Sequence, residues 1–153
     1  MATATRDQLE DLFVESVGRS SKKMGYSSYL DELVGVLEAD ETPIRVVAHA
    51  DTSQKWQPGC VLTVTSRRVL HQKPKKGLLK SGSDITSFDI EDVTAIGGRL
   101  GSFFKPARFL IHTDGDLPEY EIHGLEKEEI VQVRDAIQGS AERKNHVIAD
   151  LIE

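Results

Sequence analysis

Seven short runs of β-branched and aromatic residues fill the middle of this chain, and they constrain its fold more than any other feature. Clusters of Gly, Pro, Asp or Lys separate the runs, a pattern typical of antiparallel strands joined by turns. We expect strands at residues 44–50, 59–65, 68–72, 84–90, 93–97, 107–112 and 119–123. Residues 113–116, with Asp and Gly where a positive φ is easiest, predict the turn between the last two strands.

Helical patterns flank the strands on both sides. Apolar residues three and four apart predict amphipathic helices over 6–18, about 29–38 and 125–138. A helix directly after the last strand is well placed to cover the open end of a bent sheet. The order predicts an α+β fold: a bent antiparallel sheet or partly open barrel of about seven strands, capped by a C-terminal helix and preceded by N-terminal helices.

The expected core follows from the inward positions of the strands and of the closing helix. We expect the following side chains to be mostly buried: Val61, Leu62, Val69, Phe88, Ile96, Leu110, Ile122 and Ile137. Residues 140–153 carry a further apolar stripe, from which we expect a helical tail. The apolar residues of that stripe are Val147, Ile148, Leu151 and Ile152.

Composition narrows the class of protein. A chain of 153 residues fits one ordinary domain, and no apolar run approaches the ~20 residues that a membrane span needs. The polar start, residues 1–7, lacks the apolar stretch of a secretory signal, so we expect a cytoplasmic protein. The one cysteine, Cys60, cannot form an internal disulfide or a cysteine-based metal cluster, and we expect it to be a small buried hydrophobic residue.

Charge is distributed unevenly along the chain, although the net value is −6. Residues 1–58 hold 6 Lys and Arg against 10 Asp and Glu, residues 59–108 hold 9 against 4, and residues 109–153 hold 4 against 11. A basic middle between acidic ends favours either an anionic partner or head-to-tail attraction between copies of the chain. Composition does not distinguish these two.

Three stretches carry a family resemblance: residues 37–41 before the first strand, 59–70 across the second and third strands, and 85–96. In the second stretch a strand ends at a threonine, turns through polar residues and re-enters at an apolar pair. The residues of this hairpin are Gly59, Leu62, Thr65, Arg67, Arg68, Val69 and Leu70. Over about residues 30–138 the chain resembles bacterial pleckstrin-homology-like (PH-like) domains of the YokE-like type.

The resemblance implies a scaffold that hosts lipid-binding, peptide-binding and assembly roles. It divides the chain into an N-terminal helical extension (1–28), a PH-like domain (29–139) and a C-terminal helical tail (140–153). In the lipid-binding eukaryotic members, basic residues cluster between the first two strands. Here residues 51–58 hold a single Lys and an Asp, so a phosphoinositide pocket of that kind is not expected.

Two loops supply the candidate binding residues. Residues 73–80 place four lysines around an apolar pair, a composition suited to an anionic membrane surface or to a solvated hairpin loop. Adjacent aromatics after a glycine-rich stretch, and the tryptophan before Pro58, suit contact with a partner or packing onto the barrel. The candidates are Lys73, Lys75, Lys76, Leu78, Leu79, Lys80, Phe103, Phe104 and Trp56.

Nothing in the sequence favours catalysis. The five histidines show no metal-ligand spacing, and nucleophile-elbow and phosphate-loop motifs are missing. We therefore expect no enzyme activity, no cofactor and no metal. A nucleic-acid partner is disfavoured because no aromatic residue lies between Trp56 and Phe88.

The leading hypothesis is a PH-like interaction module that binds a protein partner or assembles into a homo-oligomer. A phage-encoded factor that acts on a host protein would carry the same pattern. The alternative is a peripheral binder of anionic membrane lipids through the 73–80 loop.

Overall fold

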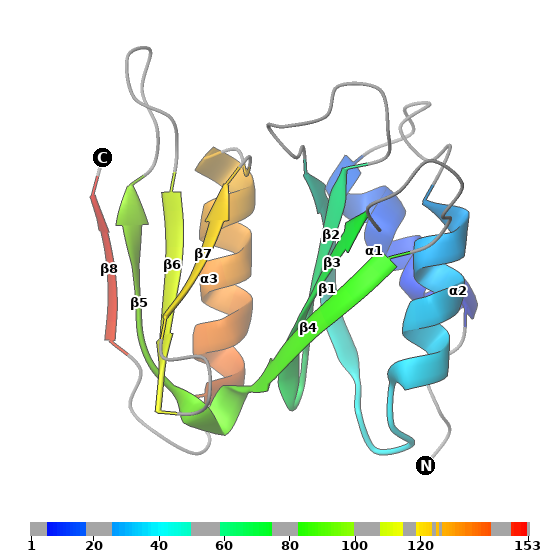
Figure 1. Cartoon of the computed structure of the whole chain (residues 1–153), viewed down its shortest axis with the longest axis horizontal. Coiled ribbons are helices and arrows are strands. Elements are labelled where there is room, and N and C mark those ends of the chain that lie inside the picture. The colour runs from blue at the N-terminus through cyan, green and yellow to red at the C-terminus, as the bar shows by residue number, and fades with distance from the viewer. Residues whose placement is uncertain are drawn as a thin grey trace.

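In the residues that the structure describes, the fold consists of two four-stranded sheets and three α-helices (Figure 1). The computed structural model describes residues 6–17, 26–49, 59–74, 83–99, 108–114, 119–123, 125, 127–141 and 148–152. In chain order the elements are α1 (Arg6–Val17), α2 (Ser27–Val36), β1 (Pro43–His49), β2 (Cys60–Thr65), β3 (Arg68–Pro74), β4 (Ser83–Asp89), the short 3-10 helix η2 (Ile90–Asp92), β5 (Val93–Arg99), β6 (Arg108–Thr113), β7 (Glu119–His123), α3 (Lys127–Ala141) and β8 (Ile148–Ile152).

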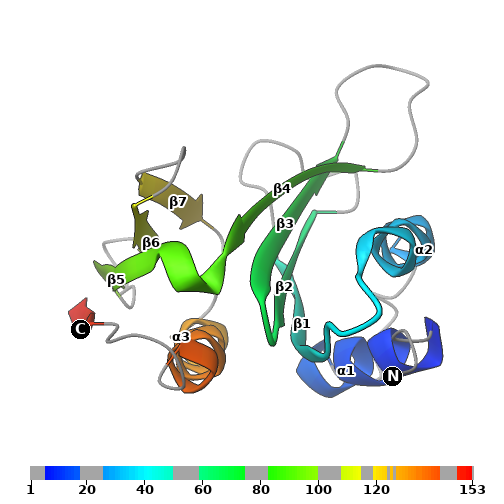
Figure 2. The same cartoon turned by 90° about the horizontal axis from the view of Figure 1, so that it is seen from below.

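The two sheets lie at an angle to each other and are joined where β4 passes through η2 into β5 (Figure 2). The first sheet has the order β1-β2-β3-β4 and is antiparallel throughout. The second has the order β7-β6-β5-β8, in which β8 alone runs parallel to its neighbour. Helix α3 lies between the two sheets (Figure 1) and contacts β1, β2 and η2. The predicted α+β architecture, an open PH-like arrangement with a C-terminal helix between the sheets, is confirmed.

The two central strands of the first sheet, β2 and most of β3, are buried on both faces. The sheet's inner face packs against the second sheet and α3 in a cluster that includes Val47, Leu62, Val69, Ile111 and Ile137. Its outer face packs against α1 and α2 through a second cluster, whose buried members are Leu9, Phe13, Tyr29, Leu30, Leu33, Leu37, Val46, Val61 and Leu70. Each such side chain contributes roughly 1.5–3 kcal/mol of hydrophobic stabilisation when fully buried.

Seven of the eight side chains predicted to be core are buried. Leu110 is the exception, because it is only half-buried. Strand β6 alternates, and its inward positions are Phe109 and Ile111, which are fully buried. The prediction for Leu110 assigned β6 the wrong face.

The C-terminal segment differs from the helical tail predicted for 140–153. Helix α3 continues to Ala141, and residues Ile148–Ile152 form the strand β8. A short apolar run is compatible with either a helix or a strand. The outer edge of β5 offers unpaired backbone groups, and pairing with that edge satisfies them. The domain boundaries at residues 28 and 139 stay a prediction.

A buried ion pair fixes the end of the first sheet where β1 begins. Glu41, 2% exposed, accepts hydrogen bonds from Arg68 Nε at 2.9 Å and Arg68 Nη2 at 2.6 Å. Thr65 Oγ1 donates to the same carboxylate at 2.6 Å, and the Glu38 backbone N–H donates at 3.1 Å. Burial raises the pKa of Glu41, but the bonds from Arg68, Thr65 and the Glu38 N–H outweigh it and hold the pKa below its usual value.

We expect Glu41→Gln to lower the free energy of unfolding by about 3–5 kcal/mol at neutral pH, because it leaves the Arg68 guanidinium without its counter-charge. The lowered pKa means that the carboxylate stabilises the fold above its ordinary value of 4.5, and that this stabilisation is lost as the pH falls below it. Urea unfolding at neutral and acidic pH measures both effects.

Glu38→Gln is the matched control, because its carboxylate pairs with Arg67 at an exposed site. It should cost no more than about 1 kcal/mol. Equal losses in the two variants, or an equal acid sensitivity of Glu41→Gln and the wild type, would contradict the role given to the buried pair.

Candidate functional site

A cluster of polar side chains lies on the inner face of the first sheet, at the end opposite the Glu41–Arg68 pair. Strand β1 ends at His49 and β2 begins at Cys60, and these two residues are direct cross-strand partners. On β3, His71 pairs with Leu62, two residues along β2 from Cys60. Since side chains two apart in a strand share a face, all three point the same way.

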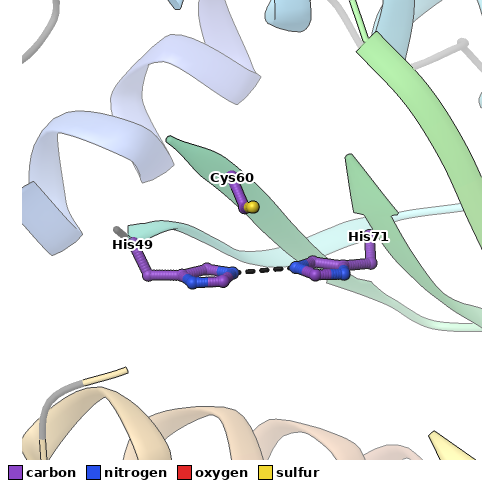
Figure 3. Close-up of side chains that lie close together, drawn as sticks. All are labelled: His49, Cys60 and His71. Carbon is purple, nitrogen blue, oxygen red and sulfur yellow. Dashed lines mark hydrogen bonds between the residues drawn. The ribbon is translucent and has the colours of Figure 1, made fainter. Parts of the chain in front are cut away.

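The three side chains come close together and are shielded from solvent (Figure 3). His49, Cys60 and His71 are 6, 3 and 2% exposed. The Nε2 atoms of the two histidines lie 2.8 Å apart, and the rings are nearly parallel, at 7°, and lie end to end. One ring nitrogen of each histidine and Cys60 Sγ all lie within 4.8 Å of one another. In the described ranges, no other group of three His, Cys, Asp or Glu gathers its ligand atoms in this way.

A tyrosine from the second sheet completes the arrangement. The second ring nitrogen of His71, Nδ1, lies 2.6 Å from Tyr120 Oη on β7. Burial raises the pKa of Tyr120 to about 12, so the phenol stays protonated at neutral pH. Tyr120 also packs against Phe88, at 5.9 Å between ring centroids. The hydrogen-bonded series His49–His71–Tyr120 thus joins the two sheets.

Of the residues predicted to bind a partner, Lys73 lies in the described part of the chain. It is exposed on β3, and its ammonium lies 5.6 Å from the centroid of the Tyr120 ring, within cation–π range. Lys73 is two residues from His71 and shares its face, so it lies beside the cluster. The other predicted residues lie outside the described residues: Lys75, Lys76, Leu78, Leu79, Lys80, Phe103, Phe104 and Trp56.

The adjacent arginines Arg67 and Arg68 do not lie beside Lys73. Both residues lie at the opposite end of β3, where Arg68 holds Glu41 and Arg67 pairs with Glu38 and with Asp40 at 2.8 Å. Thr65 Oγ1 accepts the backbone N–H groups of Arg67 and Arg68, which fixes the tight turn. These hairpin residues therefore serve the fold.

Sequence reasoning missed His49, Cys60 and His71 as a group, although the register of the predicted strands carried the signal. Strands at 44–50 and 59–65 that pair evenly across their loop set residue 49 opposite residue 60. A two-residue turn at 66–67 sets residue 71 opposite residue 62, as observed. Metal-ligand spacing within one segment was the wrong criterion, because the three ligand atoms come from three strands.

Comparison with known proteins gives the fold. No family model matches the chain, and no curated protein matches it. In structure the chain is similar to the hSac2 domain from human phosphoinositide phosphatase Sac2, with a TM-score of 0.60 over 89% of this chain and 92% of that chain. The two are 11% identical, so the likeness concerns architecture. Among the described helices, none has the length and apolar character needed to cross a membrane.

Proposed function

We propose that this chain is a non-enzymatic PH-like interaction module that assembles with further copies of itself by strand exchange at the edge of β5. The observation that supports this proposal is the pairing of β8 with β5. Residues 148–152 add to that edge in parallel, from Ala95↔Ile148 to Arg99↔Ile152. A parallel fourth strand on an otherwise antiparallel three-stranded sheet is an addition to the domain rather than part of its meander.

Strand exchange is the low-cost route by which such an edge joins two copies. The same segment that satisfies the β5 edge within one chain satisfies it equally between chains, because the backbone hydrogen bonds are identical. The segment follows α3 and lies beyond the region that resembles bacterial PH-like domains. The proposal also includes that this chain is related to the bacterial PH-like domains and that it is located in the cytoplasm. A phage-encoded factor would present the same edge to a strand of a host protein.

The absence of catalysis in this proposal is supported by the burial of the reactive groups. Among the described residues, Cys60 brings a thiol close to two histidines, and Cys60 is 3% exposed. A nucleophile must reach its substrate, and a buried thiol is poorly accessible to an organic substrate.

Removal of residues 142–153 should abolish assembly. Light scattering after size-exclusion chromatography should give the full chain a mass of at least twice the 17.0 kDa of one copy, and the truncated chain the mass of a monomer. A peptide of residues 146–153 should bind the truncated chain. The same peptide with Ala149→Pro and Leu151→Pro is the control, because proline cannot donate to a ladder.

Either of two results would sink the strand-exchange proposal. One is a full chain that stays monomeric at high micromolar concentration. The other is an oligomer whose mass the truncation leaves unchanged, since assembly would then use another surface. If the full chain is a monomer and a peptide from a different protein binds at the β5 edge, that edge serves a foreign partner instead of a second copy.

The second candidate function is binding of anionic lipids at the 73–80 loop. Two observations favour it: Lys73 is exposed beside the open end of the first sheet, and the structural neighbour belongs to a phosphatase of phosphoinositides. The net charge of −6 opposes it, because the acidic ends of the chain are repelled by the same surface.

We expect vesicles rich in anionic lipid to capture little of the protein at physiological salt. Each lysine near an anionic surface contributes about 1 kcal/mol of attraction, and salt at that concentration screens it. Vesicle sedimentation over a range of salt concentrations measures this. Strong, salt-sensitive capture that is lost in the triple variant Lys75→Gln, Lys76→Gln, Lys80→Gln, but kept in Lys127→Gln on α3, would make lipid binding the leading function.

A further inference from the structure

The geometry of the inner face points to a metal site: we propose that His49, Cys60 and His71 bind one thiophilic transition-metal ion, Zn²⁺ or Cu⁺, through Nε2, Sγ and Nε2. Two imidazoles and one thiolate are the donors that these ions prefer. The site is separate from the β5 edge, so it does not depend on the assembly proposed above.

The distances are close to those of a coordinated ion. Bonds of ~2.0–2.1 Å to each nitrogen at a tetrahedral angle place the two nitrogens about 3.3 Å apart. The two Nε2 atoms lie 2.8 Å apart, and one ring nitrogen of each histidine lies with Cys60 Sγ inside 4.8 Å. Opening the histidine pair by about half an ångström, estimated from those bond lengths, admits the ion. Sγ comes from the middle strand, between the two histidines (Figure 3).

The hydrogen bonds already prepare His71 as a ligand. A metal-binding histidine usually donates its other ring N–H to an acceptor, which fixes the tautomer and the ring orientation. Tyr120 Oη, 2.6 Å from His71 Nδ1, is in place to accept that proton. Tyr120 is thus a positioning residue for the site.

Metal binding at this site is balanced in protons without any further reactant. In the absence of the ion, one proton lies between the two Nε2 atoms, so one imidazole carries it on Nε2. When the ion binds, that imidazole shifts its proton to Nδ1 and both Nε2 lone pairs face the metal. The Cys60 thiol loses its proton to solvent, so each ion releases one proton.

The surroundings make such a cluster costly without an ion. Val47, Leu62 and Val69, which lie on the same face of the sheet, are apolar and buried. Three polarisable groups in that layer add less hydrophobic stabilisation than aliphatic side chains would. A bound ion offsets this loss, because binding to the folded chain adds its free energy to stability.

Titration of the metal-free, untagged full chain with Co²⁺ tests the site spectroscopically. We expect one equivalent of Co²⁺ to give thiolate-to-metal charge-transfer absorption, and Zn²⁺ to displace it. In a parallel anaerobic arm, Cu⁺ competes against a chromophoric chelator. The melting temperature of the wild type should rise with the ion that the site prefers, a readout that needs no variant.

Variants locate the ion. Cys60→Ser and His71→Gln should each weaken binding at least tenfold and remove the charge-transfer band or shift its position. Tyr120→Phe should keep the band and weaken binding by about 10–100-fold, because it removes only the hydroxyl that accepts the proton of His71 Nδ1. His123→Gln on β7, where the histidine side chain is 52% exposed, is the matched control and should bind as the wild type does.

Two results would overturn the proposal. One is a folded wild type that takes up none of the three ions at micromolar concentration. The other is uptake that Cys60→Ser and His71→Gln leave unchanged, which would mean that surface groups bind the metal. Far-ultraviolet circular dichroism of each variant establishes that a loss of binding is not a loss of fold.

Discussion

Burial of the two central strands of the first sheet, on both faces, is the constraint on which the rest of this structure depends. Every residue of β2 and the middle of β3 are buried, because α1 and α2 cover one face and the second sheet with α3 covers the other. A polar side chain in these two strands is therefore costly unless it finds a partner inside the protein. The two ends of the sheet meet this demand differently.

At one end, Glu41 and Arg68 form a charged pair that Thr65 and backbone groups complete. Its partners are fixed, and its effect is structural. At the other end, His49, Cys60 and His71 bring a ring nitrogen of each histidine and the cysteine sulfur close together. The charges of Glu41 and Arg68 balance each other without a ligand. The cluster of His49, Cys60 and His71 instead offers nitrogen and sulfur ligands that suit a cation. That difference separates the structural end from the candidate site.

Local patterns predicted most of the fold. β-branched runs gave the strands, and the stripe that ends at Ile137 gave the helix between the sheets, because these periods depend only on which face is buried. The strand at 148–152 was missed because its partner, the edge of β5, is distant in sequence. Leu110 was assigned to the wrong face of β6, because a shift of one residue moves every side chain of a strand to the other face, and here Phe109 and Ile111 are the buried ones.

The candidate site was harder to predict than the fold, for a related reason. His49, Cys60 and His71 are separated by 11 and 11 positions, and only the strand register brings them together. The basic loop drew attention because its lysines are adjacent in sequence. In the described residues, Lys73 contacts the Tyr120 ring, which in turn reaches His71, so the predicted loop and the missed cluster meet at one tyrosine.

The most direct test of this account is anomalous diffraction at the zinc edge from crystals of the full chain saturated with Zn²⁺. The account predicts one strong peak per chain, ~2.0–2.1 Å from Nε2 of His49 and of His71 and ~2.3 Å from Cys60 Sγ, with the two nitrogens moved apart. Crystals that keep the 2.8 Å contact between the Nε2 atoms, and show anomalous peaks only at surface side chains, would contradict it.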